Sequence, residues 1–246
     1  MFAAEDSLML RVVYRTAADG SAWQADLPVL RVATLAGQGD HVYTGTLRLP
    51  EDVVYALFAV EDDRGSRVDS RGRETWELLV YDDDKPAYDA LMQKTYDLQH
   101  RNWELAFETA QQATELYSNH AVAWLALSSL QQLFYGDAGL PRELKSQHRA
   151  RFAQLEHVLA QNHAVSGADL GGMYGYAVTL GDNVAADRWR ERLLREAPEH
   201  YLALQVTLLE IQKAASTDPP STTLAKLERL WATNQSDHGP LSFYAF

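Results

Sequence analysis

The feature that most constrains this chain is an abrupt change of sequence pattern at Pro86. Before Pro86, β-branched and aromatic residues occur in short runs that end in turn-forming residues. After Pro86 these runs stop, and apolar residues recur at helical spacing. The chain has 246 residues, which is enough for two domains of ordinary size. The pattern therefore predicts a β domain over residues 1–86 and an all-α domain over residues 87–246.

Short strands are predicted throughout the first part. Val53–Val60 is an almost continuous apolar run, which is typical of a central strand. Val42–Leu49 alternates between two faces, as a strand with one covered face does. The other predicted strands are Leu8–Arg15, Val29–Leu35 and Thr75–Tyr81. Several short strands separated by turns predict an antiparallel, immunoglobulin-like β-sandwich.

Helices are predicted throughout the second part. The link Tyr135–Pro141 is rich in helix-breaking residues and is predicted to be a loop. Most links are short, which implies antiparallel neighbouring helices. The predicted helical segments are Tyr88–Tyr117 with a break near His100–Asn102, Val122–Phe134, Arg142–Gln161, Asp169–Leu180, Val184–Glu196, Tyr201–Ala214 and Thr223–Thr233.

The composition excludes several classes of function. The chain has 22 basic and 34 acidic residues, a formal net charge of −12. Nucleic acid is therefore not expected as a partner, and binding to anionic membranes is disfavoured. No apolar run approaches the roughly 20 residues that a membrane span needs. The absence of cysteine excludes disulfides, Cys-ligated zinc and a Cys nucleophile.

Local catalytic and metal-binding motifs are not found. The eight histidines form no H-E-x-x-H motif, and we interpret them as solvated or capping residues. The segment Leu170–Gly175 lacks the spacing of a phosphate-binding loop, and its glycines are interpreted as helix-packing residues. We therefore expect no catalytic residue, no metal and no cofactor, and the chain is predicted not to be an enzyme. An enzyme whose site forms only in three dimensions is the remaining catalytic alternative.

Small residues recur at a fixed spacing in the helical part. Gly181, Ala186 and Pro198 are separated by 5 and 12 residues, and Ala106 and Ser118 show the same 12-residue gap. A W-x-x-L pair begins six residues after Ser118. These spacings resemble the tetratricopeptide repeat, in which a small residue lets the two helices of a repeat touch. In that family a glycine ends the first helix and a proline ends the second.

The resemblance implies an array of helical hairpins whose first helices line a concave, protein-binding face. By matching the spacings, it places six residues on that face: Leu91, Thr95, Leu125, Ser129, Gln132 and Gly175. It buries Ala106 and Ala186 between paired helices. These two alanines are 80 residues apart, about 12 more than two 34-residue periods, so the middle unit must carry an insertion. A plain helical bundle with chance spacing is the alternative.

A sandwich followed by helical pairs also resembles the N-terminal accessory region of bacterial envelope proteins in the thioredoxin-like disulfide reductase family. The resemblance is carried by Val54–Asp62, Val68–Ser70 and Trp76–Val80. It implies a periplasmic or extracytoplasmic location and an accessory role, because the C-x-x-C of the reductase is missing. The last residues, Gly239–Phe246, look like the opening of a further helix. We expect that this segment either packs back or leads into a longer natural protein.

The sequence thus predicts a non-catalytic interaction or scaffold module with a protein or peptide partner. A carbohydrate-binding sandwich with a helical extension is the alternative, because such modules stack sugars on exposed aromatic rings. Trp23 lies in a polar stretch and is the candidate for exposure. Trp76 alternates with Leu78 and Val80 and is predicted to point into the core.

Two basic clusters lie on predicted helices. One comprises Arg142, Lys145, Arg149 and Arg151, and the other comprises Arg188, Arg190, Arg192 and Arg195. Because they are mixed with acidic residues, we interpret both clusters as solvated faces. A docking surface for an acidic partner is the alternative.

Overall fold

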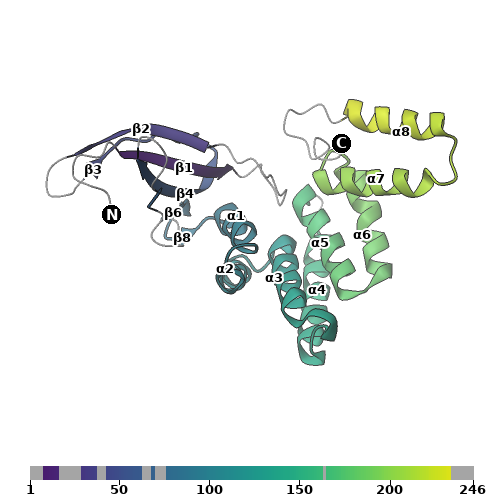
Figure 1. Cartoon of the computed structure of the whole chain (residues 1–246). Coiled ribbons are helices and arrows are strands. Elements are labelled where there is room, and N and C mark those ends of the chain that lie inside the picture. The colour runs from purple at the N-terminus through teal and green to yellow at the C-terminus, as the bar shows by residue number, and fades with distance from the viewer. Residues whose placement is uncertain are drawn as a thin grey trace. The chain divides into compact units, whose positions relative to one another are not determined.

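The computed structural model of the chain combines a small antiparallel β-sheet with helices that follow it in sequence (Figure 1). It describes residues 8–16, 29–37, 43–62, 68–69, 76–162 and 165–233. The predicted mixture of an N-terminal β part and a C-terminal α part is confirmed. Trp23, Val42 and the final segment Gly239–Phe246 lie outside the described residues.

The main sheet has the strand order β3-β2-β1-β4-β5, and β6 also pairs with β4. All of these pairs are antiparallel. Because β4 lies between β1 and β5, the prediction of Val53–Val60 as a central strand is confirmed. The strands are β1 (Leu8–Thr16), β2 (Val29–Gly37), β3 (Tyr43–Thr44), β4 (Val53–Asp62), β5 (Val68–Asp69) and β6 (Trp76–Leu79).

The core of the sheet is formed by β1 and β4. Val12, Val53 and Ala56 are buried together. The β-branched residues of these strands suit a pleated surface that is covered on one face. Partly buried apolar residues pack around this cluster: Leu10, Tyr14, Leu47, Leu49 and Phe58.

Within the described residues the strands form this one six-stranded sheet and a two-stranded ladder, β7 (Tyr81–Asp82) with β8 (Lys85–Pro86). A closed sandwich stays a prediction. The segment predicted as a strand over Val42–Leu49 is paired only at Tyr43 and Thr44. The ladder stops at Gly45, a residue type that weakens strands.

The predicted burial of Trp76 is wrong. Trp76 is 49% exposed and Leu78 is 40% exposed. Both residues belong to β6, which pairs with β4. Alternation correctly places Trp76 and Leu78 on one face of the strand, but it does not tell which face the rest of the protein covers.

Two helices follow the strands, α1 (Tyr88–Leu98) and α2 (Trp103–Leu116), and the predicted break between them is confirmed. Helix α1 packs against β4. An ion pair between Lys94 Nζ and Glu77 Oε1, 2.5 Å apart, joins α1 to β6. Asn102 begins α2, because its Oδ1 accepts a hydrogen bond from the backbone N–H of Leu105 at 3.2 Å.

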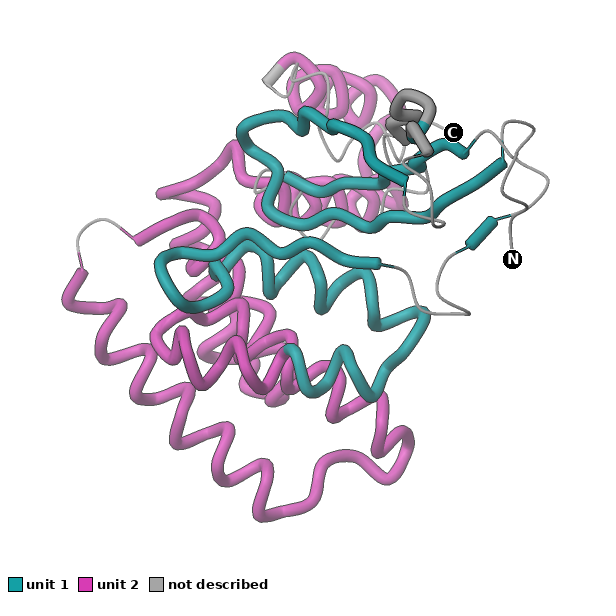
Figure 2. The backbone as a smooth tube through the Cα atoms, turned by 90° about the vertical axis from the view of Figure 1, so that its left-hand side faces the viewer, with its two compact units in different colours: residues 1–109 teal, residues 110–246 magenta. Residues whose placement is uncertain are grey.

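The chain divides into two compact units, residues 1–109 and residues 110–246 (Figure 2). The division falls inside α2, so α1 and the start of α2 are grouped with the sheet. Pro86 marks the change from strands to helices. A domain boundary at that residue stays a prediction.

In its described residues the second unit contains six further α-helices, which match the predicted segments to within a few residues. A single 3₁₀ turn, η2 (Gly136–Ala138), lies in the predicted loop Tyr135–Pro141. The helices are α3 (Ala121–Tyr135), α4 (Arg142–Ala160), α5 (Gly167–Leu180), α6 (Asn183–Glu196), α7 (Tyr201–Ala214) and α8 (Pro220–Thr233).

Helix α5 is the centre of this unit and packs against α3, α4 and α6. Its glycines permit close approach. A Cβ atom on Gly172 would lie 2.8 Å from the backbone nitrogen of Val122 in α3. A Cβ atom on Gly171 would overlap Leu202 of α7. The interpretation of these glycines as helix-packing residues is confirmed.

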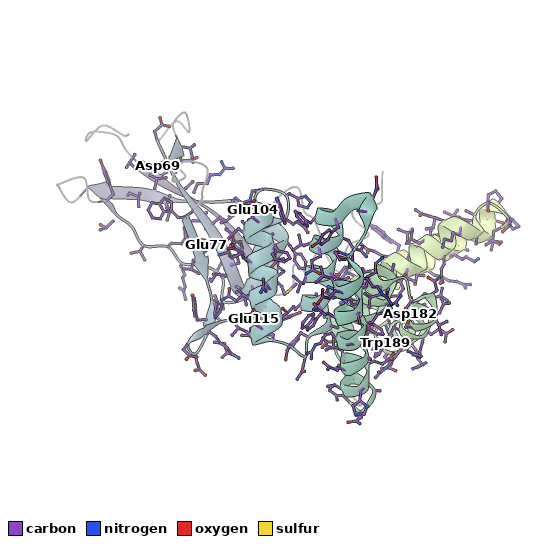
Figure 3. The ribbon with its side chains drawn as sticks, turned by 90° about the horizontal axis from the view of Figure 1, so that it is seen from below. Asp69, Glu77, Glu104, Glu115, Asp182 and Trp189 are labelled. Atoms are coloured by element: carbon purple, nitrogen blue, oxygen red, sulfur yellow. The ribbon has the colours of Figure 1, made fainter. Side chains whose placement is uncertain are left out.

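Helices α5 and α6 form a tightly packed hairpin. Gly181 ends α5 in the left-handed conformation, with φ of 71°, and its N–H bonds to Ala177 O and Val178 O. Asp182 then begins α6, because its Oδ1 accepts a hydrogen bond from Ala185 N at 3.0 Å. Figure 3 labels Asp182, which precedes α6, and Trp189 of α6. Ala106 and Ala186 are both buried, as predicted.

Candidate protein-binding site

A groove of about 520 Å³ lies between α7 and α8 in the second unit. Helix α7 is capped by the preceding residue His200, whose Nδ1 accepts a hydrogen bond from Leu202 N. Helix α8 begins at Pro220, a residue that favours the first helical position. The groove wall contains both apolar and charged side chains. The lining residues are Thr207, Glu210, Ile211 and Ala214 from α7, and Lys226, Arg229 and Leu230 from α8.

Ion pairs hold charged side chains on both walls of the groove. Glu210 Oε1 accepts a hydrogen bond from Arg190 of α6 at 2.6 Å. Lys226 Nζ lies 2.6 Å from Asp218 Oδ2 at the end of the α7–α8 link. Exposed pairs of this kind contribute at most about 1 kcal/mol to stability. Their main effect here is to set an acidic group on the α7 wall and a basic group on the α8 wall.

One side of α8 exposes a row of large apolar side chains. Leu224 is 56% exposed, Leu227 is 37% exposed and Trp231 is 54% exposed. The spacings of three and four residues place them on one face of the helix. We call these three residues the α8 apolar face. Helix α8 packs on α7, and its partly buried residues Thr223, Lys226 and Leu230 lie on the neighbouring face of the helix.

The α8 apolar face differs from the apolar faces of the neighbouring helices. Trp189 and Leu193 of α6 are 3% and 0% exposed. In α7, the residues that face inward are Ala203, Leu204, Val206, Leu208 and Ile211. An amphipathic helix normally covers its apolar stripe, and contiguous apolar surface that stays exposed marks an interaction site.

Four of the six residues predicted to bind protein lie on α3 and α5. A Cβ atom on Gly175 would lie 2.7 Å from Leu125 Cδ2, so these two residues are in contact. Gln132 Nε2 donates a hydrogen bond to Thr179 O of α5 at 2.5 Å. Ser129 lies between Leu125 and Gln132 on the same face of α3 and is half-buried. The structure thus brings this face of α3 against α5.

The other two predicted residues, Leu91 and Thr95, lie on α1 in the first unit. Each is 1% exposed. Thr95 Oγ1 donates a hydrogen bond to Leu91 O at 2.8 Å, within the same helix. The exposed apolar residues of α8 were not among the predicted residues. Their three- and four-residue spacing was visible in the sequence, but spacing alone does not tell whether another helix covers the face.

A buried polar cluster in the second unit was also missed. His148 of α4 is 4% exposed. Its Nδ1 accepts a hydrogen bond from the Tyr176 hydroxyl at 2.6 Å, and its Nε2–H donates one to Gln131 Oε1 at 2.5 Å. Burial lowers the pKa of His148 below its ordinary value of 6.5, which keeps the ring neutral.

The interpretation of His148 as a solvated or capping residue is therefore wrong, whereas His200 does cap a helix. The signal was present in the sequence. His148 lies four residues before Phe152 and four after Leu144, on the apolar side of α4. With both ring nitrogens engaged inside the protein, the cluster joins α3, α4 and α5.

The basic clusters lie mostly at the surface, as predicted. Arg142, Lys145 and Arg149 are exposed. Arg151 differs, because its guanidinium stacks over the Trp124 ring at 5.0 Å and donates a hydrogen bond to Ser118 O. In the second cluster, Arg188, Arg190, Arg192 and Arg195 form ion pairs with glutamates.

Among the described residues, no three histidine or carboxylate side chains gather in a group that could hold a metal ion. None of the described helices is both long and apolar enough to cross a membrane. Comparison of the chain with family models, curated proteins and solved structures gave no match. The geometry of the α7–α8 groove and the α8 apolar face is therefore the basis on which function is considered.

Proposed function

We propose that this chain is a non-catalytic protein-interaction module that binds a peptide or helix of a partner protein at the α7–α8 groove. The observation that carries the proposal is the groove together with the α8 apolar face beside it. A helical ligand could lay its own apolar stripe on Leu224, Leu227 and Trp231, in the helix-in-groove mode. Trp231 supplies the type of side chain that most often dominates such interfaces.

The groove walls also suggest the polar part of the ligand. Glu210 and Lys226 carry opposite charges on the two sides, and each is already held in an ion pair, with Arg190 and with Asp218 respectively. A ligand with a basic and an acidic side chain on opposite edges of its apolar stripe would share these pairs. Such charges would fix the orientation of the ligand more than they would raise its affinity.

We further propose that the helices form tetratricopeptide-like hairpins. Helices α1, α3, α5 and α7 begin at Tyr88, Ala121, Gly167 and Tyr201, which are 33, 46 and 34 residues apart. Two of these intervals lie close to the family period of about 34 residues. The long interval contains η2 and the 19-residue helix α4, which is where the sequence predicted an insertion. This spacing supports the proposal, and the α3 and α5 residues predicted to bind protein stay predictions within it.

The test uses the full chain and random peptides displayed on phage. Peptides enriched on the wild-type chain are synthesised, and their affinities are measured for a Leu227→Ser/Trp231→Ser double variant. A Val178→Ser/Val184→Ser double variant is the control, because both valines are exposed apolar residues outside the groove. We expect the groove variant to bind at least about tenfold more weakly, a loss of about 1.4 kcal/mol, and the control to bind as the wild type does. Equal binding by both variants would overturn the proposal.

One observation supports the carbohydrate-binding alternative. Trp76 and Tyr81 of the strands are 49% and 57% exposed, and exposed rings are what sugar stacking requires. A Trp76→Ala/Tyr81→Ala variant tests it on immobilised polysaccharides. Retention of the wild type but not of this variant would favour a sugar ligand for the sheet.

A further inference from the structure

The connection between α3 and α4 carries a second exposed surface, separate from the α7–α8 groove. We call residues 133–149 the α3–α4 tip. It comprises the end of α3, the η2 turn and the first two turns of α4. It is the lowest part of the magenta unit in Figure 2. The tip lies in the 46-residue interval between helix starts, where the chain is longer than in the neighbouring intervals.

The tip exposes two large apolar side chains. Leu133 is 75% exposed and Phe134 is 60% exposed. The Phe134 ring contacts the Tyr135 ring edge-on, with centroids 5.0 Å apart. Leu140 is 4% exposed and anchors the turn in the unit. The two apolar side chains are therefore exposed on a connection that Leu140 anchors in the unit.

The tip also carries three exposed cations on one face of α4. Arg142, Lys145 and Arg149 follow one another by three and four residues and span an arc of about 60° around the helix. Over the described part of the chain, none of them forms an ion pair. Lys145 Nζ lies 3.7 Å from the Cβ position of Gly139, so it reaches back over the turn.

This arrangement contrasts with the arginines of α6. Each arginine of the second basic cluster has a glutamate partner, so its charge is balanced inside the unit. Two acidic residues lie at the tip, Asp137 in η2 and Glu143 in α4. Glu143 is about 100° around the helix from Arg142, away from the cationic face. The tip thus carries both exposed positive charge and exposed apolar side chains within one connection.

From this juxtaposition we infer that the α3–α4 tip docks an acidic segment of a protein partner that also carries an apolar side chain. Carboxylates of the segment pair with Arg142, Lys145 and Arg149, and its apolar side chain covers Leu133 and Phe134. Three cations fall below the roughly four to eight that polybasic segments use on anionic membranes. The net charge of −12 opposes both membranes and nucleic acid, which leaves a local protein contact.

The test uses the full chain and three short fluorescent peptides, in which leucines are interspersed with glutamate, glutamine or lysine. Affinity is measured by fluorescence polarisation at low and at raised salt concentration. The matched variants are Lys145→Glu and Lys213→Glu, which change the net charge equally and both replace an exposed helical lysine. Phe134→Ser removes the apolar contact.

We expect the glutamate peptide to bind and the lysine peptide not to bind. Salt and Lys145→Glu each weaken binding, the substitution by about tenfold, whereas Lys213→Glu leaves it unchanged. Phe134→Ser weakens binding at both salt concentrations. The Leu227→Ser/Trp231→Ser variant retains the glutamate peptide, so failure of the groove proposal and failure of this one are distinguishable.

Three results would overturn the inference. The first is equal affinity for the glutamate and lysine peptides, or equal loss in Lys145→Glu and Lys213→Glu. The second is retention by phosphatidylserine vesicles without binding of the glutamate peptide, which would assign the tip to a membrane surface. The third is self-association in sedimentation that Lys145→Glu abolishes, which would make a second copy of the chain the occupant.

Discussion

The α5–α6 and α7–α8 hairpins are built from helices of the same length, yet they differ in where their apolar side chains lie. Each of the four helices has 14 residues. In α6, Trp189 is 3% exposed and its Nε1–H bonds to Glu156 Oε1 at 2.9 Å. In α8, Trp231 is 54% exposed. The comparison shows that one amphipathic pattern is buried in the first hairpin and leaves large apolar side chains exposed in the second.

The largest difference is expected from the two tryptophans. Trp189→Ala should lower the free energy of unfolding by about 3–5 kcal/mol, because it leaves a cavity where a nearly fully buried ring was and removes its hydrogen bond to Glu156, which keeps its ion pair with Arg188. Trp231→Ala should change it by no more than about 0.5 kcal/mol. Urea unfolding followed by circular dichroism measures both. Equal losses would show that the α8 apolar face is covered in solution and that the two hairpins do not differ in this respect.

The next effect concerns the tight contact of α5 and α6. Ala186 is 7% exposed, and enlarging it forces the helices apart. Ala186→Leu should cost about 1–3 kcal/mol through overpacking. Ala225→Leu on the exposed side of α8 is the control and should be close to neutral, because leucine and alanine both favour helices. A neutral Ala186→Leu would contradict the register in which Ala186 is the small residue of a hairpin.

A smaller effect is expected from pH. The pKa of His148 is lowered by burial, so the unfolded chain binds a proton at a higher pH than the folded chain does. Stability is therefore complete above the unfolded value near 6.5 and decreases as the pH falls below it. His200 acts in the same direction, because burial lowers its pKa too.

The variant His148→Gln isolates the first contribution. It removes the titrating group, so the free energy of unfolding of the variant should depend less on pH between neutral and mildly acidic solution. Urea midpoints measured across that range provide the slopes. Parallel slopes for wild type and variant would show that His148 does not stay neutral in the fold.

The sequence predicted the helices better than it predicted their exposure. Tyr201–Ala214 was predicted with the same bounds that α7 has, because apolar periodicity and breakers act locally. His148 lies on the apolar side of α4, so its burial could have been predicted from spacing, whereas the exposure of Trp76 and Trp231 could not. Whether each of these two tryptophans is covered depends on which segment far away in the chain packs against it. The groove between α7 and α8 is formed by residues of both helices, so no single sequence motif predicts it.

The smallest expected effect is the absence of turnover, which follows from our proposal that both candidate surfaces bind partners. Thiol–disulfide exchange needs a thiolate that attacks a disulfide sulfur, and this chain contains no cysteine. The purified chain should therefore reduce a disulfide substrate no faster than buffer does. A screen with ester, phosphate and glycoside substrates should give the same result. The assay compares purified wild type with a variant, because a contaminating enzyme would give the same turnover in both preparations. Turnover that follows the chain through purification and is lost in His148→Gln, while the folded content stays unchanged, would contradict the non-catalytic proposal. It would also move the functional site from the α7–α8 groove to the buried cluster between α3, α4 and α5.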